Sequence, residues 1–262
     1  MKWPDTGLVL RLGTAQTLAW ASTYYLPALL ARPMAGELGL ADTTVWLHFS
    51  LALGLSALLG PASGRAIDRQ GGRRVLCTSS LVFAAGLATL GLAPNATVLL
   101  IGWLLLGLGM GCGLYDAAFA TLVRLKGEAA RAAITGVTLL GGFASTVGWP
   151  LSAWLSTQWG WREACLAWAA LHLLIGLPCN ASLPRMSAVA PLRQPTGQAP
   201  TESTTPVTRR GLWVGVALAY VFGAAWFVST ALAAHLPQML MAHGASLSAA
   251  VATAARASPV RT

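Results

Sequence analysis

The sequence predicts an all-α protein that crosses a membrane many times as a bundle of helices. Three observations favour this fold class. First, 55% of the 262 residues are hydrophobic and only 10% are charged, whereas soluble domains carry about 25% charged residues. Second, uncharged runs of about 20 residues recur along the chain, and this is the length that a helix needs to cross the bilayer core. Third, the arginines stand in short turns between these runs.

The apolar runs predict six spans in the first 183 residues. Residues 75–123 are counted as two spans, because they carry a single charge and contain the turn signal Gly91-Leu92-Ala93-Pro94-Asn95. The six spans are expected at residues 12–31, at 43–64, twice within 75–123, at 132–161 and at 164–183. In span five, Gly148-Trp149-Pro150 predicts a kink near the outer end.

The composition changes after residue 183, and this change divides the chain into three parts. Residues 1–183 form the six-helix transmembrane part. Residues 184–210 contain five prolines, many serines and threonines, and four arginines against one glutamate, which is typical of a solvated cytoplasmic linker. Residues 211–262 begin a second transmembrane part, with span seven at 211–234, an outside turn at 235–237 and an incomplete span eight from about residue 246.

The positions of the basic residues predict the orientation of the spans. With the N-terminus inside, 15 of the 17 basic residues lie in cytoplasmic segments, and only Arg32 and Arg162 lie outside. Short cytoplasmic loops of membrane proteins carry such an excess of arginine and lysine. We therefore expect a multi-pass protein of the cell (inner or plasma) membrane with a cytoplasmic N-terminus. The net charge of +9 reflects this topology. We therefore expect the lipid bilayer as a partner of the protein, and no nucleic acid.

The turn between spans two and three, residues 64–74, carries a motif of four arginines, three glycines and one aspartate. Its pattern resembles the signature G-x-x-x-D-R-x-G-R-R between helices two and three of the major facilitator superfamily of secondary transporters. The matching residues are Gly64, Asp68, Arg69, Gly71 and Arg73, with Arg74 as a further cation. Gly72 departs from the pattern, since the family usually has a basic residue there.

The resemblance implies two six-helix halves, of which this chain contains the first and about one and a half helices of the second. Residues 34–40 and 239–245 resemble each other and align Gly39 with Gly244, as parallel repeats predict. A complete second half would continue well beyond residue 262. Two explanations stay open: a C-terminally truncated product, or a fragment that pairs with a missing C-terminal half.

Asp116 is the one acidic residue inside a predicted span. Its spacing places it on one helical stripe with Gly102, Gly109 and Gly113, so we expect it to face the interior of the bundle. An ionisable group inside a membrane is costly and marks a functional site, which favours a site for a proton or for a substrate cation. The alternative is a structural acid that pairs with Arg124 or with an arginine of the 64–74 turn.

Two further helix faces carry polar and aromatic side chains that suit an organic substrate. The candidates are Gln16, Trp20, Thr23 and Tyr24 on span one, and Thr138, Ser145 and Trp149 on span five. The resemblance implies that helices one and four line a central cavity and that helix five meets the opposite half. Ordinary helix packing through small and hydroxyl residues is the alternative for both faces.

The sequence thus predicts a transporter of a small organic solute that works by alternating access, driven by protons or another gradient. The alternative is a non-transporting remnant, or a half-transporter that needs a partner chain. We do not expect an enzyme, because the sequence shows no pairing of a nucleophilic residue with a general base. No cofactor and no metal site are predicted, since the four cysteines lack C-x-x-C spacing.

Overall fold

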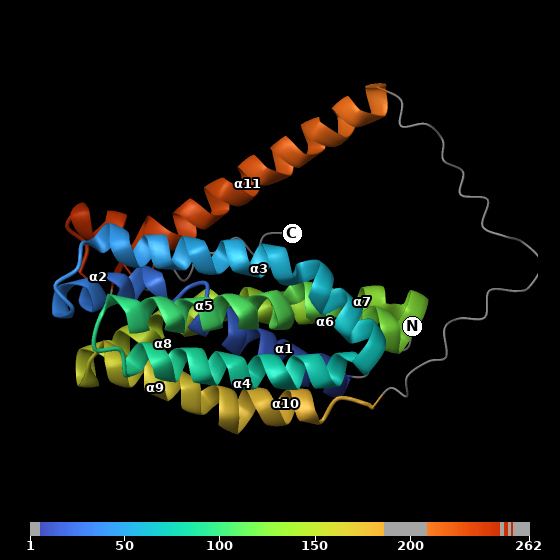
Figure 1. Ribbon diagram of the computed structural model, residues 1–262, viewed down its shortest axis with the longest axis horizontal. Coiled ribbons are helices and arrows are strands. Elements are labelled where there is room, and N and C mark those ends of the chain that lie inside the picture. The colour runs from blue at the N-terminus through green and yellow to red at the C-terminus, as the bar shows by residue number, and fades with distance from the viewer. Residues whose placement is uncertain (1–5, 186–208, 247–248, 251–252, 254–262) are drawn as a thin grey trace, which may run out of the picture.

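A computed structural model describes residues 6–185, 209–246, 249–250 and 253 of the chain. All regular secondary structure in these residues is helical, which confirms the predicted all-α class. Figure 1 shows the helices of residues 6–181 as one bundle, from which the helix of residues 209–242 leans away. Most of the linker predicted at residues 184–210 lies outside the described residues, at 186–208, as does the end of the chain at 254–262. Residues 209 and 210 of the predicted linker belong to the helix of residues 209–242.

Span one consists of two helices, α1 (Thr6–Ser22) and α2 (Pro27–Glu37), and is not one continuous helix over residues 12–31. Pro27 has no N–H group, so it cannot continue the hydrogen bonds of α1. A hydrogen bond of 3.2 Å from the amide of Tyr25 to the carbonyl of Trp20 bridges the interruption. Because α2 continues past Pro33 to Glu37, the outside loop is shorter than predicted.

Spans two and three form a helical hairpin of α3 (Asp42–Gln70) and α4 (Gly72–Gly91). The predicted turn is helical almost throughout, and Gly71 alone separates the two helices. Gly71 has a φ of 84°, which glycine adopts without a steric penalty, and its amide caps α3 on the carbonyl of Ile67. The prediction of a longer loop was wrong because arginines at a membrane surface suit an exposed helix end equally well.

Span four is divided at Leu114 into α5 (Ala96–Gly113) and α6 (Tyr115–Lys126). The side chain of Asn95 caps α5 by accepting a hydrogen bond from the amide of Val98. Leu114 has extended backbone, with φ −83° and ψ −165°. No sequence signal predicted this break. The short 3₁₀ turn η1 (Gly127–Ala129) follows α6.

Span five consists of α7 (Ala130–Gly142) and α8 (Ala144–Trp159), which meet at Phe143. Gly148, Trp149 and Pro150, where the sequence predicts a kink, lie inside α8. The interruption between α7 and α8 follows Gly141 and Gly142, and glycines weaken a helix interior because they lose the most backbone entropy on folding.

Span six runs without interruption through α9 (Trp161–Leu171), the π-helical turn η2 (His172–Gly176) and α10 (Leu177–Ala181). Such π-helical turns are rare and occur frequently at functional sites. The turn η2 is in contact with α1 and α4. Its first and last residues, His172 and Gly176, are buried, whereas the three residues between them are exposed.

The last helix, α11 (Arg209–Ala242), continues through the outside turn predicted at residues 235–237, and that prediction was wrong. Its second part contacts the bundle. The ring of His235 lies 5.0 Å from the ring of Trp46, and Gln238 donates a hydrogen bond of 3.4 Å to the carbonyl of Ala28 in α2. Its first part extends away from the other helices in Figure 1.

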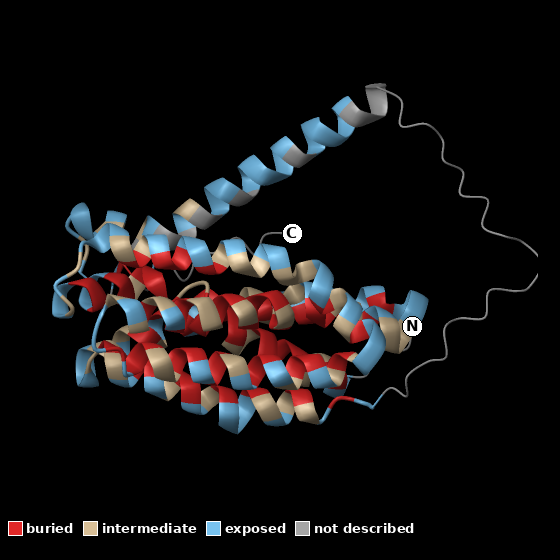
Figure 2. Cartoon of the chain, in the orientation of Figure 1, coloured by how far each residue is buried: buried red, intermediate tan, exposed pale blue. Residues whose placement is uncertain are grey.

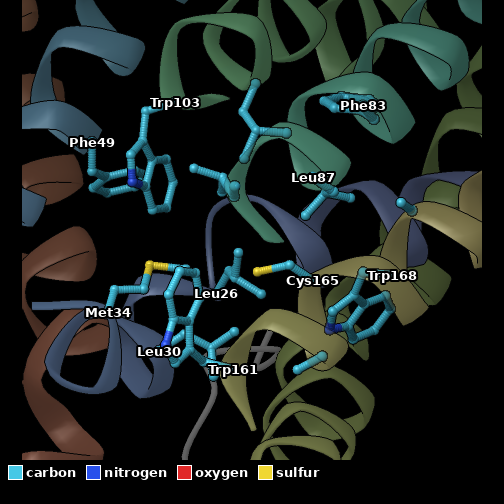
Figure 3. Close-up of a cluster of buried hydrophobic side chains, with 14 of the residues drawn as sticks. Leu26, Leu30, Met34, Phe49, Phe83, Leu87, Trp103, Trp161, Cys165 and Trp168 are labelled. Atoms are coloured by element: carbon cyan, nitrogen blue, oxygen red, sulfur yellow. The ribbon is translucent and has the colours of Figure 1, made fainter. Parts of the chain in front are cut away.

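The core lies between the helices of the bundle, where Figure 2 shows their inward faces buried. Among the large side chains of Figure 3, Trp103 is fully buried and its ring lies 5.4 Å from that of Phe49. Glycines bring the helices close: a Cβ added to Gly107 would lie 2.5 Å from the carbonyl oxygen of Ala52 in α3. The predicted glycine stripe faces α4, through Gly102, Gly109 and Gly113.

Four helical stretches among the described residues are long and apolar enough to cross a membrane. These are Asp42–Gln70, Gly72–Gly91, Ala96–Trp159 and Trp161–Ala181. The third contains α5 to α8 and therefore corresponds to two spans. Large apolar side chains such as Leu58 and Leu174 are exposed on the outside of the bundle, as contact with lipid requires.

Candidate functional site

Two side chains of α1 bond to backbone oxygens near the helix breaks of spans four and five. Gln16 is buried, and its Nε2 donates a hydrogen bond of 2.7 Å to the carbonyl of Gly113, the last residue of α5. The hydroxyl of Thr17 donates to the carbonyl of Leu140 at 2.9 Å, shortly before the break between α7 and α8. Irregular backbone inside a membrane is tolerated only where such partners are present. The breaks of spans four and five therefore both lie beside α1.

A row of aromatic rings connects α1 with α6 across these breaks. The ring of Trp20 lies 5.2 Å from that of Tyr24 and 4.9 Å from that of Tyr115. Tyr115 in turn stacks on Phe119 at 5.0 Å, with an angle of 11° between the ring planes. The Tyr115 hydroxyl donates to the carbonyl of Thr138 at 3.4 Å. We call Tyr24, Trp20, Tyr115 and Phe119 the aromatic row.

The span-one candidates are brought together at one end of this row. Trp20 and Tyr24 belong to the row, and Gln16 lies one turn before Trp20 in α1. Thr23 is buried, and its hydroxyl donates to the carbonyl of Ala19 at 2.6 Å. That bond satisfies its hydroxyl proton within its own helix, so Thr23 contributes less to a binding surface than the prediction assumed.

The span-five candidates are not brought together. Thr138 is exposed, and its hydroxyl donates to the carbonyl of Ile134 at 2.9 Å. Trp149 is buried, and its Nε1 donates to the carbonyl of Tyr25 at 3.2 Å. This bond gives a partner to a backbone carbonyl in the break of span one. Ser145, which lies between Thr138 and Trp149 in the sequence, is also buried.

Two buried polar atoms of α1 at the aromatic row have no hydrogen-bond partner among the described residues. They are Oε1 of Gln16 and Nε1 of Trp20. A buried polar atom without a partner costs free energy, on the order of 1–3 kcal/mol. A ligand with its own donors and acceptors would recover that free energy, and the rings beside these atoms would cover its apolar part.

Asp116 lies in the first turn of α6 and is exposed. The expectation of an acid on the inward glycine stripe is wrong, because the extended residue Leu114 interrupts the helical periodicity between Gly113 and Asp116. Asp116 directly follows Tyr115 of the aromatic row, so its carboxylate belongs to the same segment of α6.

The alternative pairing of Asp116 with Arg124 is not found either. Arg124 instead donates from Nη1 to the carbonyl of Ile67 at 2.7 Å and to the carboxylate of Asp68 at 3.3 Å. This pair joins the end of α6 to the end of α3. The side chain of Asp68 is mostly exposed, so its direct contribution to stability is small.

The remaining signature residues surround the Gly71 turn. Arg69 and Arg74 are exposed, whereas Arg73 and Gly64 are partly buried. The structure gives a reason for the departure at Gly72: this residue is buried, and an added Cβ would overlap the side chain of Thr121 in α6. A basic side chain at position 72 would therefore push α4 and α6 apart.

A second cluster, at the end of the bundle opposite the Gly71 turn, was not predicted from the sequence. We call it the outer clamp, because that end is the outer one in the predicted topology. Arg162 donates from Nε to Oε1 of Glu37 at 2.7 Å, and from Nη1 to the carbonyls of Gly91 at 3.1 Å and Ala93 at 2.7 Å. Trp161 donates from Nε1 to Oε2 of Glu37 at 2.6 Å. The clamp thus ties α2, the turn after α4 and the start of α9 to one another.

The outer clamp makes stability depend on pH. The hydrogen bond from Arg162, and then that from Trp161, hold the pKa of Glu37 below its ordinary value. A carboxyl whose pKa is lowered on folding stabilises the protein above the unfolded pKa, and this contribution is lost as the pH falls through the folded pKa. We expect the Tm difference between the wild type and Glu37→Gln, measured by tryptophan fluorescence, to be present at pH 6 and to vanish near pH 3. A difference that stays constant over this range would contradict the assignment.

The comparisons with known proteins agree with this architecture. Residues 12–258 match the family model of the Major Facilitator Superfamily. The chain is 32% identical over 181 residues to the "Uncharacterized 38 kDa protein in 23S RNA operon" of Thermoproteus tenax, over 67% of this chain and 47% of that protein.

Two further relatives carry transport-related names. The chain is 31% identical over 148 residues to the "Multidrug resistance protein B homolog" of Mycobacterium tuberculosis, over 56% of this chain and 26% of that protein. It is 31% identical over 155 residues to the "Proton myo-inositol cotransporter hmit-1.2" of Caenorhabditis elegans, over 54% of this chain and 24% of that protein.

The matched segments cover less than half the length of these relatives. The family match, however, covers nearly all of the chain, and the apolar helices identify it as a multi-pass membrane protein. The chain belongs to the major facilitator superfamily of transmembrane transporters, and it is not an enzyme.

Proposed function

We propose that the chain forms the first half, with the start of the second half, of a secondary transporter for a small organic solute. Residues 1–183 would be the six-helix half, 184–210 the cytoplasmic linker and 211–262 the beginning of the other half. The N-terminus would lie in the cytoplasm and the protein in the cell membrane. Alternating access would move the two halves about a central site, driven by protons or another gradient.

The observation that carries this proposal is the aromatic row together with the unpartnered polar atoms beside it. Transporters of this kind bind substrate where helices are discontinuous near the middle of the membrane, and the row spans the breaks of spans one and four. Rings next to Oε1 of Gln16 and Nε1 of Trp20 suit a solute with one apolar face and several hydrogen-bonding groups. Relatives named for multidrug resistance and for myo-inositol cotransport support an organic solute.

The second candidate function is a half-transporter that needs a further polypeptide. The first part of α11 exposes large apolar side chains, among them Trp213, Tyr220 and Phe227. In a transporter with two complete halves, helices of the second half would cover this surface.

Binding to the purified chain in lipid nanodiscs tests both candidates. We expect at least one compound from a panel of polyols and amphiphilic drugs to quench tryptophan fluorescence, and Trp20→Leu to weaken this binding at least tenfold. Trp159→Leu is the matched control, because Trp159 is exposed at the end of α8, and its binding should equal that of the wild type. Binding with uptake into liposomes would support a transporter, and binding without uptake a half-transporter. The absence of any binding would contradict both.

Coupling to protons is tested at Asp116. If Asp116 binds the coupling proton, the pH dependence of binding or uptake should be lost in Asp116→Asn. Asp68→Asn is the control, since Asp68 lies at the inner end on the Gly71 turn, away from the aromatic row. An unchanged pH profile in Asp116→Asn would remove this residue from the coupling mechanism.

A further inference from the structure

The aromatic row has one full charge beside it, and that charge is negative. Residues 12–31, 96–123 and 132–161 supply the row and the helices that pack around it, and Asp116 is the single charged side chain in these three stretches. Its carboxylate is exposed and forms no ion pair or hydrogen bond with a described residue. A charge inside a membrane is costly without a partner or water, so this carboxylate needs a counter-charge.

The carboxylate of Asp116 lies on the same side of α6 as the ring of Phe119. The two residues are three positions apart, and such residues are neighbours on a helix surface. Phe119 stacks on Tyr115, both rings are only half-buried, and the neighbouring Thr138 is exposed. Asp116 and these rings therefore border one open face of the described bundle. In the proposed transporter this face would line the central site, because ionisable groups in membranes face the protein interior or water.

The basic side chains on the same helices lie toward the end of the bundle that contains the Gly71 turn. Arg124 is eight residues beyond Asp116, about 12 Å along the helix axis, and it binds Asp68. Arg11 donates to two backbone carbonyls at the start of α1 and the end of span six. Arg131 lies in the first turn of α7, about two turns before the part of α7 that contacts the row. None of these cations forms an ion pair with Asp116 among the described residues.

The uncharged groups of the site also favour a positive charge. The faces of aromatic rings are electrostatically negative, and a cation within about 6 Å of a ring centroid is attracted to it. Oε1 of Gln16, which has no partner in the described part of the chain, adds a further partial negative charge. An anion would be repelled by Asp116 and by the ring faces, and a neutral solute would gain none of this attraction.

We propose that the solute of this site is an organic cation, such as a quaternary ammonium compound. Its positive centre lies against the ring faces of the aromatic row, with Asp116 as the counter-charge, and its apolar groups contact the rings. The inference rests on the proposed function, because it assigns a chemical class to the solute of the same site.

Pairs of compounds that have the same shape but different charge test this assignment. Binding is measured by calorimetry to the purified chain in phosphatidylcholine nanodiscs, and the signal of empty nanodiscs is subtracted. Choline is compared with dimethylbutanol, its neutral isostere with carbon in place of nitrogen, and tetraphenylphosphonium is compared with the tetraphenylborate anion. We expect the cation to bind roughly tenfold tighter than its partner in at least one pair. Equal or weaker binding of the cation in both pairs would overturn the proposal.

Two substitutions assign the preference to the groups that we name. Asp116→Asn removes the counter-charge and should weaken binding of the preferred cation roughly tenfold, while binding of its partner does not weaken. Phe119→Leu keeps an apolar side chain but removes a ring face, and it should weaken binding of the cation more than that of its partner. A preference that persists unchanged in Asp116→Asn would overturn the proposal.

Glu128→Gln is the matched control for Asp116→Asn. Glu128 is an exposed carboxylate in η1, beyond the end of α6, so its removal changes the net charge equally and leaves the site intact. The preference for the cation should stay as in the wild type, and an equal loss in both variants would show that net charge alone causes it.

The same titrations separate this inference from the proposed function. Binding of compounds that lack a positive charge, without a preference for cations, would leave a solute site in place and overturn only the assigned class. The absence of binding by both pairs and by the wider panel of polyols and drugs would contradict the proposed function as well.

Discussion

Replacing Arg162 by alanine is expected to lower the Tm of the purified chain by roughly 5–10 °C. Arg162 binds two backbone carbonyls of the turn after α4 and the carboxylate of Glu37. Its side chain is only 26% exposed, so water replaces these bonds poorly. The carbonyls of Gly91 and Ala93 would lose a charged donor, and such bonds contribute more than neutral ones.

Arg32→Ala is the control for Arg162→Ala. Arg32 also lies at the outer end and pairs with Asp42 at 3.5 Å, but the two side chains are 67% and 53% exposed. An exposed ion pair contributes about 0–1 kcal/mol, so the Tm should change by no more than about 3 °C. Equal losses in both variants would show that the outer clamp adds nothing beyond surface charge. Arg162→Lys should recover little, because one ammonium group cannot reproduce the forked contacts of the guanidinium.

Gly107→Ala is expected to have the second large effect. The new Cβ would lie 2.5 Å from the carbonyl oxygen and 2.9 Å from the Cα of Ala52. Both atoms belong to the backbone of α3, so no side chain can turn aside and the two helices must separate. Overpacking of this kind costs typically about 1–3 kcal/mol, and we expect a Tm lower by roughly 3–10 °C together with more aggregate in size-exclusion chromatography.

Gly54→Ala in α3 is the matched control for Gly107→Ala. It adds the same methyl group where no atom lies within 4 Å, and alanine is the better helix former. We expect a Tm equal to or above that of the wild type. A loss of stability at Gly54 as large as that at Gly107 would mean that the effect does not come from close contact between α3 and α5.

The sequence predicted the positions of the helices well but not their interruptions. Apolar runs and arginine turns follow directly from the physics of the bilayer, which is why the spans were found. The break at Leu114 has no proline beside it, and Gly113, which directly precedes it, was interpreted as part of a packing stripe. At the break the carbonyl of Gly113 accepts the hydrogen bond from Gln16, which is 97 positions away, and no local pattern reports such a contact.

The candidate site was predictable only in part, for the same reason. Periodicity places Gln16, Trp20 and Thr23 on one face of span one with Tyr24 at its edge, and this was enough to group Gln16, Trp20 and Tyr24. Tyr115 and Phe119 were missed, although an aromatic pair four residues apart beside Asp116 was a usable signal. The expected inward position of Asp116 was wrong because the helical spacing was carried across an interruption.

The outer clamp also had a signal in the sequence. Arg162 is one of only two basic residues on the outer side of the predicted topology. An arginine that departs from the charge rule needs local partners to compensate it, and the structure provides four contacts for Arg162, including the ring of Trp161 at 4.4 Å. Exceptions to a topology rule are therefore useful places to look for tertiary contacts.

The single residue between α3 and α4 restricts how these helices can move. A connection of one glycine has no slack, so the ends of the two helices at Gly71 stay at a fixed separation. The connection from α2 to α3 at the opposite end spans residues 38–41 and allows more freedom. Any tilting of α3 against α4 must therefore pivot at Gly71, and its amplitude grows toward the opposite end of the helices. A label near Trp46 would report such tilting with far greater sensitivity than one near Arg69.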